Sequence, residues 1–306
     1  MTTERAAFAA ADWGTSNFRI WLFDAEGVPL AERRSDEGMS ALSGSTAAFA
    51  DALERHLGAL GAPRDLPVVA SGMVGARQGW IDAGYGPLPA RLDGLAGGAV
   101  RAPGASRDVR ILPGLAQADP PDVMRGEETK LAGAAAAIGG GRRLVLMPGT
   151  HSKWARIENG AITGFRTSMT GELFSVLSEK SILRHSSDGS HADPHGPVFR
   201  AWTETGLTEG AKLSSLLFRI RAAGLVGGLQ AADGASALSG LLIGAEVGAA
   251  EPMDGPVVLI SGGSLLPLYR SVLEIAGRDF VEVDADDAVR RGLYEAGRAL
   301  FLETSR

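Results

Sequence analysis

The order of apolar and polar positions along the chain predicts strands and helices that follow one another. Short apolar runs are typical of buried strands, and they occur at 18–23, 66–70, 144–147 and 257–260. Longer stretches at 49–60, 213–220 and 289–300 carry apolar residues three or four positions apart, which is typical of helices. Because the two kinds of element alternate, the sequence predicts an α/β fold.

The same order of elements occurs twice. The first copy consists of a strand, a tight turn at Gly14 and a hairpin. The second copy has the same three elements, with its tight turn at Gly149, 135 positions later. Solenoid repeats are far shorter, so we interpret the pattern as a duplicated domain. We expect the boundary in the proline-containing segment 115–125. The first lobe is then 1–122 and the second 123–306, with the final helix packing back on the first lobe.

Composition narrows the class of protein. Of 306 residues, 45% are hydrophobic and 22% are charged, which is typical of a globular chain. The formal charge of −6 argues against general nucleic-acid binding, and the lack of cysteine excludes disulfides, thiol catalysis and Cys-ligated metals. The most apolar window, 238–250, is interrupted by Glu246 and is too short to span a bilayer. We expect a soluble cytoplasmic enzyme without nucleic-acid or membrane partners.

Two turns have the composition of anion-binding sites. Glycine lets backbone N–H groups approach a phosphate, and hydroxyl side chains add donors. The first turn contains Gly14, Thr15 and Ser16 and follows Asp12, a carboxylate suited to Mg²⁺. The second contains Gly149, Thr150, His151 and Lys153. Either turn alone is also compatible with a polar hairpin turn, but two in equivalent positions could hold one polyphosphate from both sides.

A third glycine-containing segment follows the buried strand at 257–260. Its residues are Ser261, Gly262, Gly263 and Ser264, and a helix comes next. Adjacent glycines allow a flat base or ribose to lie on the backbone, and a helix N-terminus favours phosphate. A plain strand-to-helix turn is the alternative.

The order of these three turns resembles the sugar-kinase, heat-shock-ATPase and actin superfamily. Finer motifs resemble the 2-dehydro-3-deoxygalactonokinase family over nearly the whole chain. They lie at 12–19, 71–75, 123–129 (Val-Met-Arg-Gly-Glu-Glu-Thr), 147–154 (Met-Pro-Gly-Thr-His-Ser-Lys-Trp), 165–167, 170–173 and 238–246.

The resemblance implies two duplicated ribonuclease-H-like domains of the actin-like ATPase superfamily with an interdomain cleft. It implies transfer of a phosphoryl group from ATP to the terminal 6-hydroxyl of 2-dehydro-3-deoxy-D-galactonate in galactonate catabolism, with Mg²⁺. A homodimer is left open.

The resemblance also implies roles for particular residues. A carboxylate must accept the hydroxyl proton, and Glu128 is favoured slightly over Glu127. Both could instead be first-turn glutamates that interact favourably with the helix dipole. Asp12 is the expected Mg²⁺ ligand, because Met147 stands where many relatives have a second acid. Arg125 is the first choice for binding the carboxylate of the acceptor. The other expected substrate-binding residues are Arg19, Arg166, Gly72, Met73 and Glu172. Each of the six could instead have a structural role.

Other functions remain open at this stage. A related kinase could use a different acceptor, and a non-catalytic sugar or nucleotide sensor could share the scaffold. His191-x-Asp193-x-His195 could bind a metal. We favour the alternative that residues 185–195 form a polar loop, which could serve as a lid. A Rossmann dehydrogenase is disfavoured because Gly14 lacks the three-glycine spacing, and the chain has no Gly-x4-Gly-Lys-[Ser/Thr] motif.

Overall fold

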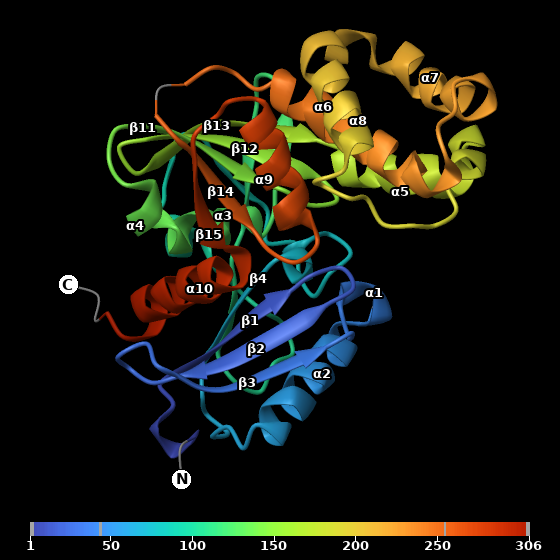
Figure 1. Ribbon diagram of the computed structural model, residues 1–306. Helices are drawn as coiled ribbons and strands as arrows, with labels where there is room; N and C mark the ends of the chain where they lie inside the picture. The colour runs from blue at the N-terminus through green and yellow to red at the C-terminus, as the bar shows by residue number, and fades with distance from the viewer. Residues whose placement is uncertain (1–2, 43–44, 254, 304–306) are drawn as a thin grey trace. The chain divides into compact units, whose positions relative to one another are not determined.

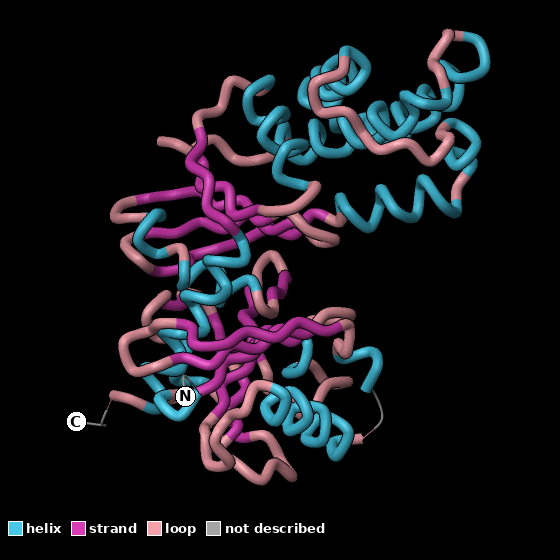
Figure 2. Tube along the Cα trace, turned by 60° about the horizontal axis from the view of Figure 1, so that its bottom comes forward, coloured by secondary structure: helices cyan, strands magenta, loops and turns pink. Residues whose placement is uncertain are grey.

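The computed structural model describes residues 3–42, 45–253 and 255–303 (Figure 1). The chain forms two compact units. Unit 1 comprises the described parts of 1–141, 157–164 and 284–306, and unit 2 comprises those of 142–156 and 165–283. Figure 2 shows the strands of each unit gathered into a sheet with helices beside it.

Unit 1 is built on a mixed sheet with the strand order β3-β2-β1-β4-β8-β7. The central strand β1 pairs antiparallel with β2 and parallel with β4, so its carboxyl end lies beside that of β4. The strands are β1 (Phe8–Trp13), β2 (Phe18–Phe23), β3 (Pro29–Ser35), β4 (Val68–Ser71), β7 (Val100–Arg101) and β8 (Val109–Ile111).

Two helices cover the two faces of this sheet. Helix α2 (Thr46–Ala59) buries Phe49 and Leu53 in one core cluster, which also contains Trp13. Helix α10 (Ala285–Phe301) buries Leu293 against the opposite face, in a cluster with Trp21. Large aromatic side chains on alternating positions of β1 and β2 therefore anchor a helix on each side.

Unit 1 also contains short strands and a small second sheet. The added elements of unit 1 are α1 (Met39–Leu42), β5 (Tyr85–Pro87), β6 (Ala90–Arg91), β9 (Gly114–Gln117) and β10 (Asp122–Met124). Strands β9 and β10 form an antiparallel hairpin. The segment 115–125, in which we expected a domain boundary, is therefore a hairpin within unit 1. The division into lobes at 122/123 stays a prediction.

Helix α3 (Glu127–Gly133) lies in direct backbone contact with α10. A Cβ atom on Gly292 would stand 1.9 Å from the carbonyl oxygen of Thr129, and one on Gly133 would stand 1.8 Å from that of Ala288. Only glycine fits at such a distance. The helical path is interrupted at Ala134, after which α4 (Ala135–Ile138) follows.

Unit 2 repeats the strand order of unit 1. The sheet order β15-β14-β11-β12-β13 corresponds position by position to β8-β4-β1-β2-β3, and β11 is parallel to β14 as β1 is to β4. The predicted duplication is confirmed in this respect. The strands are β11 (Arg142–Met147), β12 (Ser152–Glu158), β13 (Ala161–Ser168), β14 (Val257–Ser261) and β15 (Phe280–Asp284). The turn of the second hairpin is an Asn-Gly turn, with positive φ at Asn159 and Gly160.

Helices fill the connection between β13 and β14. They are α5 (Thr170–Lys180), α6 (Pro197–Glu209), α7 (Leu213–Val226) and α8 (Gly234–Gly248), and α9 (Leu265–Ile275) follows β14. Glycines four residues apart on α8 let α6 pack closely, because Cβ atoms on Gly240 and Gly244 would stand 2.5 Å from the carbonyl oxygens of Phe199 and Thr203. Helices α6 and α8 lie side by side in Figure 1. In the part of the chain that the structure describes, no helix combines the length and hydropathy needed to cross a membrane.

Candidate active site

The two glycine turns are supported in the same way, each inside its own unit. In unit 1, the backbone N–H of Met39 at the start of α1 donates to the Gly14 carbonyl at 2.9 Å. In unit 2, the N–H of Glu172 in the first turn of α5 donates to the Thr150 carbonyl at 3.0 Å. Both turns are thus held by the beginning of a helix.

A glycine at each helix start allows this close approach. A Cβ on Gly38 would stand 2.4 Å from the carbonyl oxygen of Thr15, and one on Gly171 would stand 2.5 Å from that of Gly149. The exposed residues Thr15 and Ser16 leave the first turn open on its outer side. The turns at Gly14 and Gly149 share little sequence beyond Gly-Thr, yet each is supported by the start of a helix in the same way.

Asp12 lies at the carboxyl end of β1, level with Ser71 on β4. A Cβ on Gly72 would stand 2.8 Å from the Trp13 carbonyl oxygen and 3.6 Å from Oδ1 of Asp12, so glycine lets the two strand ends meet. The Ser71 hydroxyl is fully buried and has no hydrogen-bond partner among the described residues. A buried polar atom without a partner is uncommon in a folded protein and is found at functional sites.

Four charged groups surround Asp12. Burial raises the pKa of its carboxyl group, while Lys130 and Arg19 lower that pKa and Asp286 and Glu127 raise it. Arg19 in turn forms an ion pair with Asp286 at the start of α10. Sequence reasoning missed Lys130 and Asp286, because no motif connects Asp286 with a residue 274 positions earlier.

The two candidate bases differ in accessibility. Glu128 is only 1% exposed, and both of its carboxylate oxygens accept the N–H of Gly126 at 2.8 Å. Burial, followed by the charge of Glu127, raises the pKa of Glu128 to about 7. Glu127 is half-buried, and its Oε2 accepts the N–H of Arg125 at 2.9 Å.

Arg125 is held in a fixed position by its neighbours in unit 1. Its Nη2 donates to the Gly84 carbonyl at 3.0 Å, and its guanidinium carbon lies 4.3 Å from the centroid of the Tyr85 ring. The buried Nε and Nη1 have no hydrogen-bond partner within the described chain. Unused donors on a charged guanidinium make Arg125 a candidate partner for an anion such as a carboxylate. Met73 begins a short 3-10 helix that follows β4, and it packs against the core.

The remaining candidates of unit 2 differ in what they contact. His151 and Glu172 form an exposed ion pair with Nε2 and Oε2 2.5 Å apart. Lys153 is buried, and its Nζ donates to the Thr167 hydroxyl at 2.7 Å. Arg166 donates to the carbonyl of Ala249 at 2.7 Å, just beyond the end of α8. The ligand roles of these side chains stay predictions.

A pocket of about 500 Å³ opens in unit 2 beside the second turn. Its volume lies in the range typical of sites for small molecules. It is lined by the three expected residues Gly149, Thr150 and Ser264, and by Thr170, Gly171, Phe174, Gly189, Ser190, His191, Ala192, Ser239, Leu242, Ile243, Leu265, Leu268 and Tyr269. Gly262 and Gly263 directly precede Ser264. Most of the apolar lining comes from α8 and α9, whose helical pattern by itself indicated only core.

A buried carboxylate lies behind this pocket. Glu246 of α8 is 6% exposed, and it accepts the indole N–H of Trp154 at 2.9 Å and the hydroxyl proton of Tyr269 at 2.8 Å. The Tyr269 hydroxyl also lies 2.8 Å from that of Ser152. Burial raises the pKa of Glu246, while hydrogen bonds, the largest from Thr170, lower it. The network connects the end of the second turn with two residues that line the pocket.

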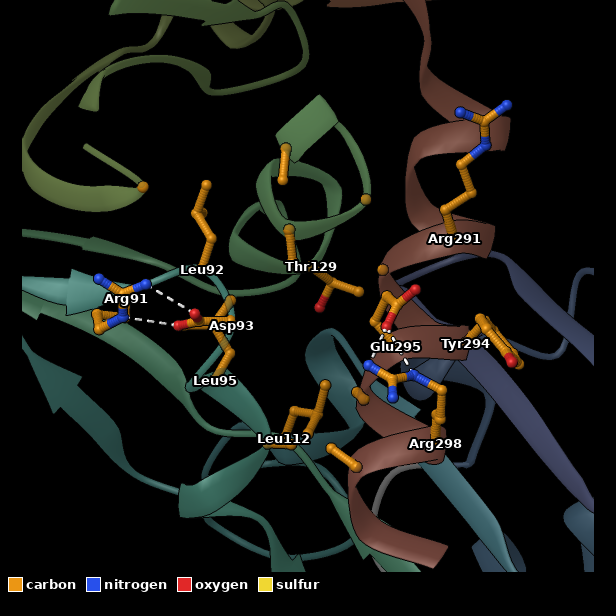
Figure 3. Close-up of a pocket in the computed structure, with 18 of the residues that line it drawn as sticks. Arg91, Leu92, Asp93, Leu95, Leu112, Thr129, Arg291, Tyr294, Glu295 and Arg298 are labelled. Atoms are coloured by element: carbon orange, nitrogen blue, oxygen red, sulfur yellow. Dashed lines mark hydrogen bonds and ion pairs between the residues drawn. The ribbon is translucent and has the colours of Figure 1, made fainter. Parts of the chain in front are cut away.

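A larger pocket, of about 680 Å³, lies within unit 1 between α3 and α10 (Figure 3). Its charged side chains are largely paired with one another, as Arg91 is with Asp93 and Arg298 with Glu295. None of the expected site residues lines it. Larger volume alone therefore does not make it the candidate site.

Comparisons with known proteins agree with this description. The 2-keto-3-deoxy-galactonokinase family matches residues 12–296. A probable 2-dehydro-3-deoxygalactonokinase of Rhizobium meliloti (strain 1021) is 47% identical, over 98% of this chain and 99% of its own length. The 2-dehydro-3-deoxygalactonokinase of Escherichia coli (strain K12) is 35% identical, over 96% and 99%.

Solved structures agree at the level of the fold. A crystal structure from Sinorhizobium meliloti, provisionally named as a 2-dehydro-3-deoxygalactonokinase, has a TM-score of 0.92 and 46% identity over 96% of this chain and 99% of its own. Component A of (R)-2-hydroxyglutaryl-CoA dehydratase from Acidaminococcus fermentans has a TM-score of 0.51 at 13% identity, over 96% and 98%. The expected α/β class is confirmed, and both solved structures share the fold. The chain belongs to the 2-keto-3-deoxy-galactonokinase family.

Proposed function

We propose that this chain transfers the γ-phosphoryl group of ATP to the 6-hydroxyl of 2-dehydro-3-deoxy-D-galactonate. Family membership over the length of the chain supports the reaction. The observation that carries the assignment of the site is the common construction of the turns at Gly14 and Gly149, each held by the start of a helix. Phosphoryl transfer depends mainly on positioning and charge neutralisation, which rigid glycine turns supply.

We assign the acceptor to unit 1. Arg125 carries a fixed positive charge and has donors without a partner among the described residues, and both properties suit the carboxylate of a sugar acid. Gly72 and Met73 directly follow β4. Gly72 lies next to Asp12, and a Cβ atom added to Gly126 would stand 3.4 Å from the Cα of Gly72. Arg19, paired with Asp286, is the alternative cation in this unit.

Within this assignment, Glu127 is the general base and Glu128 a positioning residue. A base must come within hydrogen-bond distance of the hydroxyl group, and Glu127 is the accessible carboxylate of the two. Glu128 has the pKa better suited to proton transfer at neutral pH, but its oxygens are occupied by Gly126. Position is the stricter condition, so we reverse the preference that the sequence suggested.

We assign the nucleotide to unit 2. The pocket joins an apolar wall, formed by side chains such as Phe174, Leu242 and Leu268, to the turn at Thr150 and the start of α9. An apolar wall suits a base, and backbone N–H groups at a turn and a helix start suit phosphates.

Mg²⁺ fits the residues present at the first turn. Asp12 offers hard carboxylate oxygens in a half-buried position, and Mg²⁺ is usually held by one or two carboxylates together with water and substrate phosphates. When bound, Mg²⁺ neutralises charge on the transferring phosphate. Lys130 and Arg19 favour the charged form of Asp12 that such binding requires.

The reaction balances with the groups named. The acceptor hydroxyl oxygen forms a bond to the γ-phosphorus while the bond between that phosphorus and the β,γ-bridging oxygen breaks. The hydroxyl proton passes to Glu127, and ADP leaves with the bond's electron pair. Cytoplasmic location and a homodimer stay predictions.

A coupled assay of ADP release tests the function. Purified protein is given ATP, Mg²⁺ and, in separate reactions, 2-dehydro-3-deoxy-D-galactonate, its gluconate epimer and neutral hexoses. We expect ADP release with the galactonate derivative and little without an acceptor. Turnover only with a neutral sugar would contradict the role of Arg125, and absence of turnover with every acceptor would contradict the kinase assignment.

A further inference from the structure

The polar segment 187–195 forms one wall of the pocket in unit 2. Its residues from Gly189 to Ala192 line the pocket, including the imidazole-bearing His191. The segment is attached to both helices of the pocket. The backbone N–H of Asp193 donates to the Ser236 hydroxyl of α8 at 2.9 Å, and the Pro194 carbonyl accepts from the Ser271 hydroxyl of α9 at 2.7 Å.

Helix α8 shows which end of the pocket this wall occupies. Near its carboxyl end, Glu246 is bonded to Tyr269 and lies close to Ser152, which follows the second turn. Ser236, which holds the polar segment, precedes Glu246 by ten residues, or about 15 Å of helix. The phosphate-binding turn and the segment 189–192 therefore lie toward opposite ends of one pocket.

The lining of the pocket includes the side chains that a base requires. Ser239 and Leu242 of α8 and Leu268 of α9 line the pocket, and Ser190 and His191 add a hydroxyl and an imidazole. A neutral imidazole carries one donor and one acceptor, and a hydroxyl group can serve as either. Pockets for flat ligands combine an apolar wall with a few such polar groups.

No metal is needed to explain the histidines. Among the residues that the structure describes, no group of three or more His, Cys, Asp and Glu side chains is placed to hold a metal ion. The Asp193 carboxylate accepts the backbone N–H of His195 at 3.0 Å, which is a local turn contact.

We propose that His191, with Ser190, recognises the purine base of the nucleotide, so that the polar segment selects a purine nucleoside diphosphate product and triphosphate substrate. The inference rests on the proposed function, because it takes the pocket of unit 2 as the nucleotide site. A pyrimidine, one ring smaller, leaves this wall with fewer contacts.

Calorimetric titrations with ADP and CDP test the proposal on the full-length protein. The variant is His191→Ala. The matched control is His195→Ala, which removes a histidine of the same segment that does not line the pocket. His191→Ala removes a side chain that contacts the base, so we expect ADP to bind about tenfold more weakly to this variant. CDP affinity should change less than twofold, and His195→Ala should bind both as the unaltered protein does.

Three results would overturn the inference. They are unchanged ADP affinity in His191→Ala, an equal loss for ADP and CDP, and an unaltered protein that binds ADP and CDP equally well. The proposed function is judged separately by acceptor-dependent ADP release. If the unaltered protein binds ADP but phosphorylates no acceptor, the function fails while the titrations still decide the role of His191. Circular dichroism and thermal unfolding confirm that the variants are folded.

Discussion

The hydroxyl group of Tyr269 donates to the buried carboxylate of Glu246 at 2.8 Å, on the inner side of the pocket in unit 2. Glu246 also accepts from Trp154, so one carboxylate fixes a pocket-lining residue of α9 and a residue of β12. A charge buried in this way is tolerated only because several donors surround it.

Replacing Glu246 by Ala should therefore loosen the pocket. Removing one partner of a buried network leaves donors unsatisfied at about 1–3 kcal/mol each. We expect a lower unfolding temperature and weaker ADP binding, with the KM of the acceptor nearly unchanged. Glu246→Gln should restore part of the ADP affinity. Isothermal titration measures the affinity for ADP, and acceptor-dependent kinetics measure the KM of the acceptor. Equal weakening of the binding of both ligands would argue against a role confined to this pocket.

The neighbouring glutamates of α3 should respond differently to amidation. Glu127→Gln removes the proposed proton acceptor and should lower kcat by about 10²- to 10⁴-fold with little effect on stability. Glu128→Gln should reduce kcat less, because its contact is with Gly126. Steady-state kinetics at saturating ATP separate the two. A larger loss in Glu128→Gln would return the role of base to the residue that the sequence favoured.

Stability should depend on pH through Glu128. Its pKa is raised to about 7 in the folded protein, so it holds its proton there after the unfolded chain has released it. The contribution is complete below the unfolded pKa, near 4.5, and is lost as the pH rises through about 7. It amounts to at most about 3 kcal/mol. Denaturant unfolding at pH 5 and pH 8 measures the free energy of unfolding. Between these pH values it should fall more in the unaltered protein than in Glu128→Gln, and an equal fall in both would count against the raised pKa of Glu128.

Much of the fold could be predicted from the sequence, because hydrophobic periodicity and glycine turns are local signals. The strands around Gly14 and Gly149 and the Asn159 hairpin turn belong to this group. Tertiary contacts could not be predicted in the same way. Burial separates Glu127 from Glu128, although both are first-turn glutamates of one helix. Asp286 reaches Arg19 only because α10 packs on the first sheet.

Asp12 should be essential for transfer but not for folding. Asp12→Asn keeps the shape of the side chain and removes the charge proposed to hold Mg²⁺. We expect kcat to fall by at least about 100-fold and the half-saturating Mg²⁺ concentration to rise, with ADP affinity in unit 2 retained. Asp51→Asn, at an exposed position on α2, is the matched control. Near-normal turnover in Asp12→Asn would refute the assignment.

The contact between α3 and α10 should tolerate no added methyl group. In Gly292→Ala the new Cβ would meet the Thr129 carbonyl oxygen at 1.9 Å, so the helices must separate, at a cost of about 1–3 kcal/mol. Gly97→Ala places its Cβ where no atom lies within 4 Å, so it should be nearly neutral. Thermal unfolding of the two variants provides the comparison, and similar midpoints would contradict the close packing.

The placement of α10 has a consequence for biosynthesis. Unit 1 draws its first strand from residues 8–13 and the helix that covers one face of its sheet from residues 285–301. A ribosome must therefore translate the whole of unit 2 before unit 1 can close its core. Until then the apolar face of β1 and β2 stays uncovered, so the nascent chain is exposed to aggregation, and a truncated product that ends before α10 should be degraded rather than accumulate as a partly active enzyme.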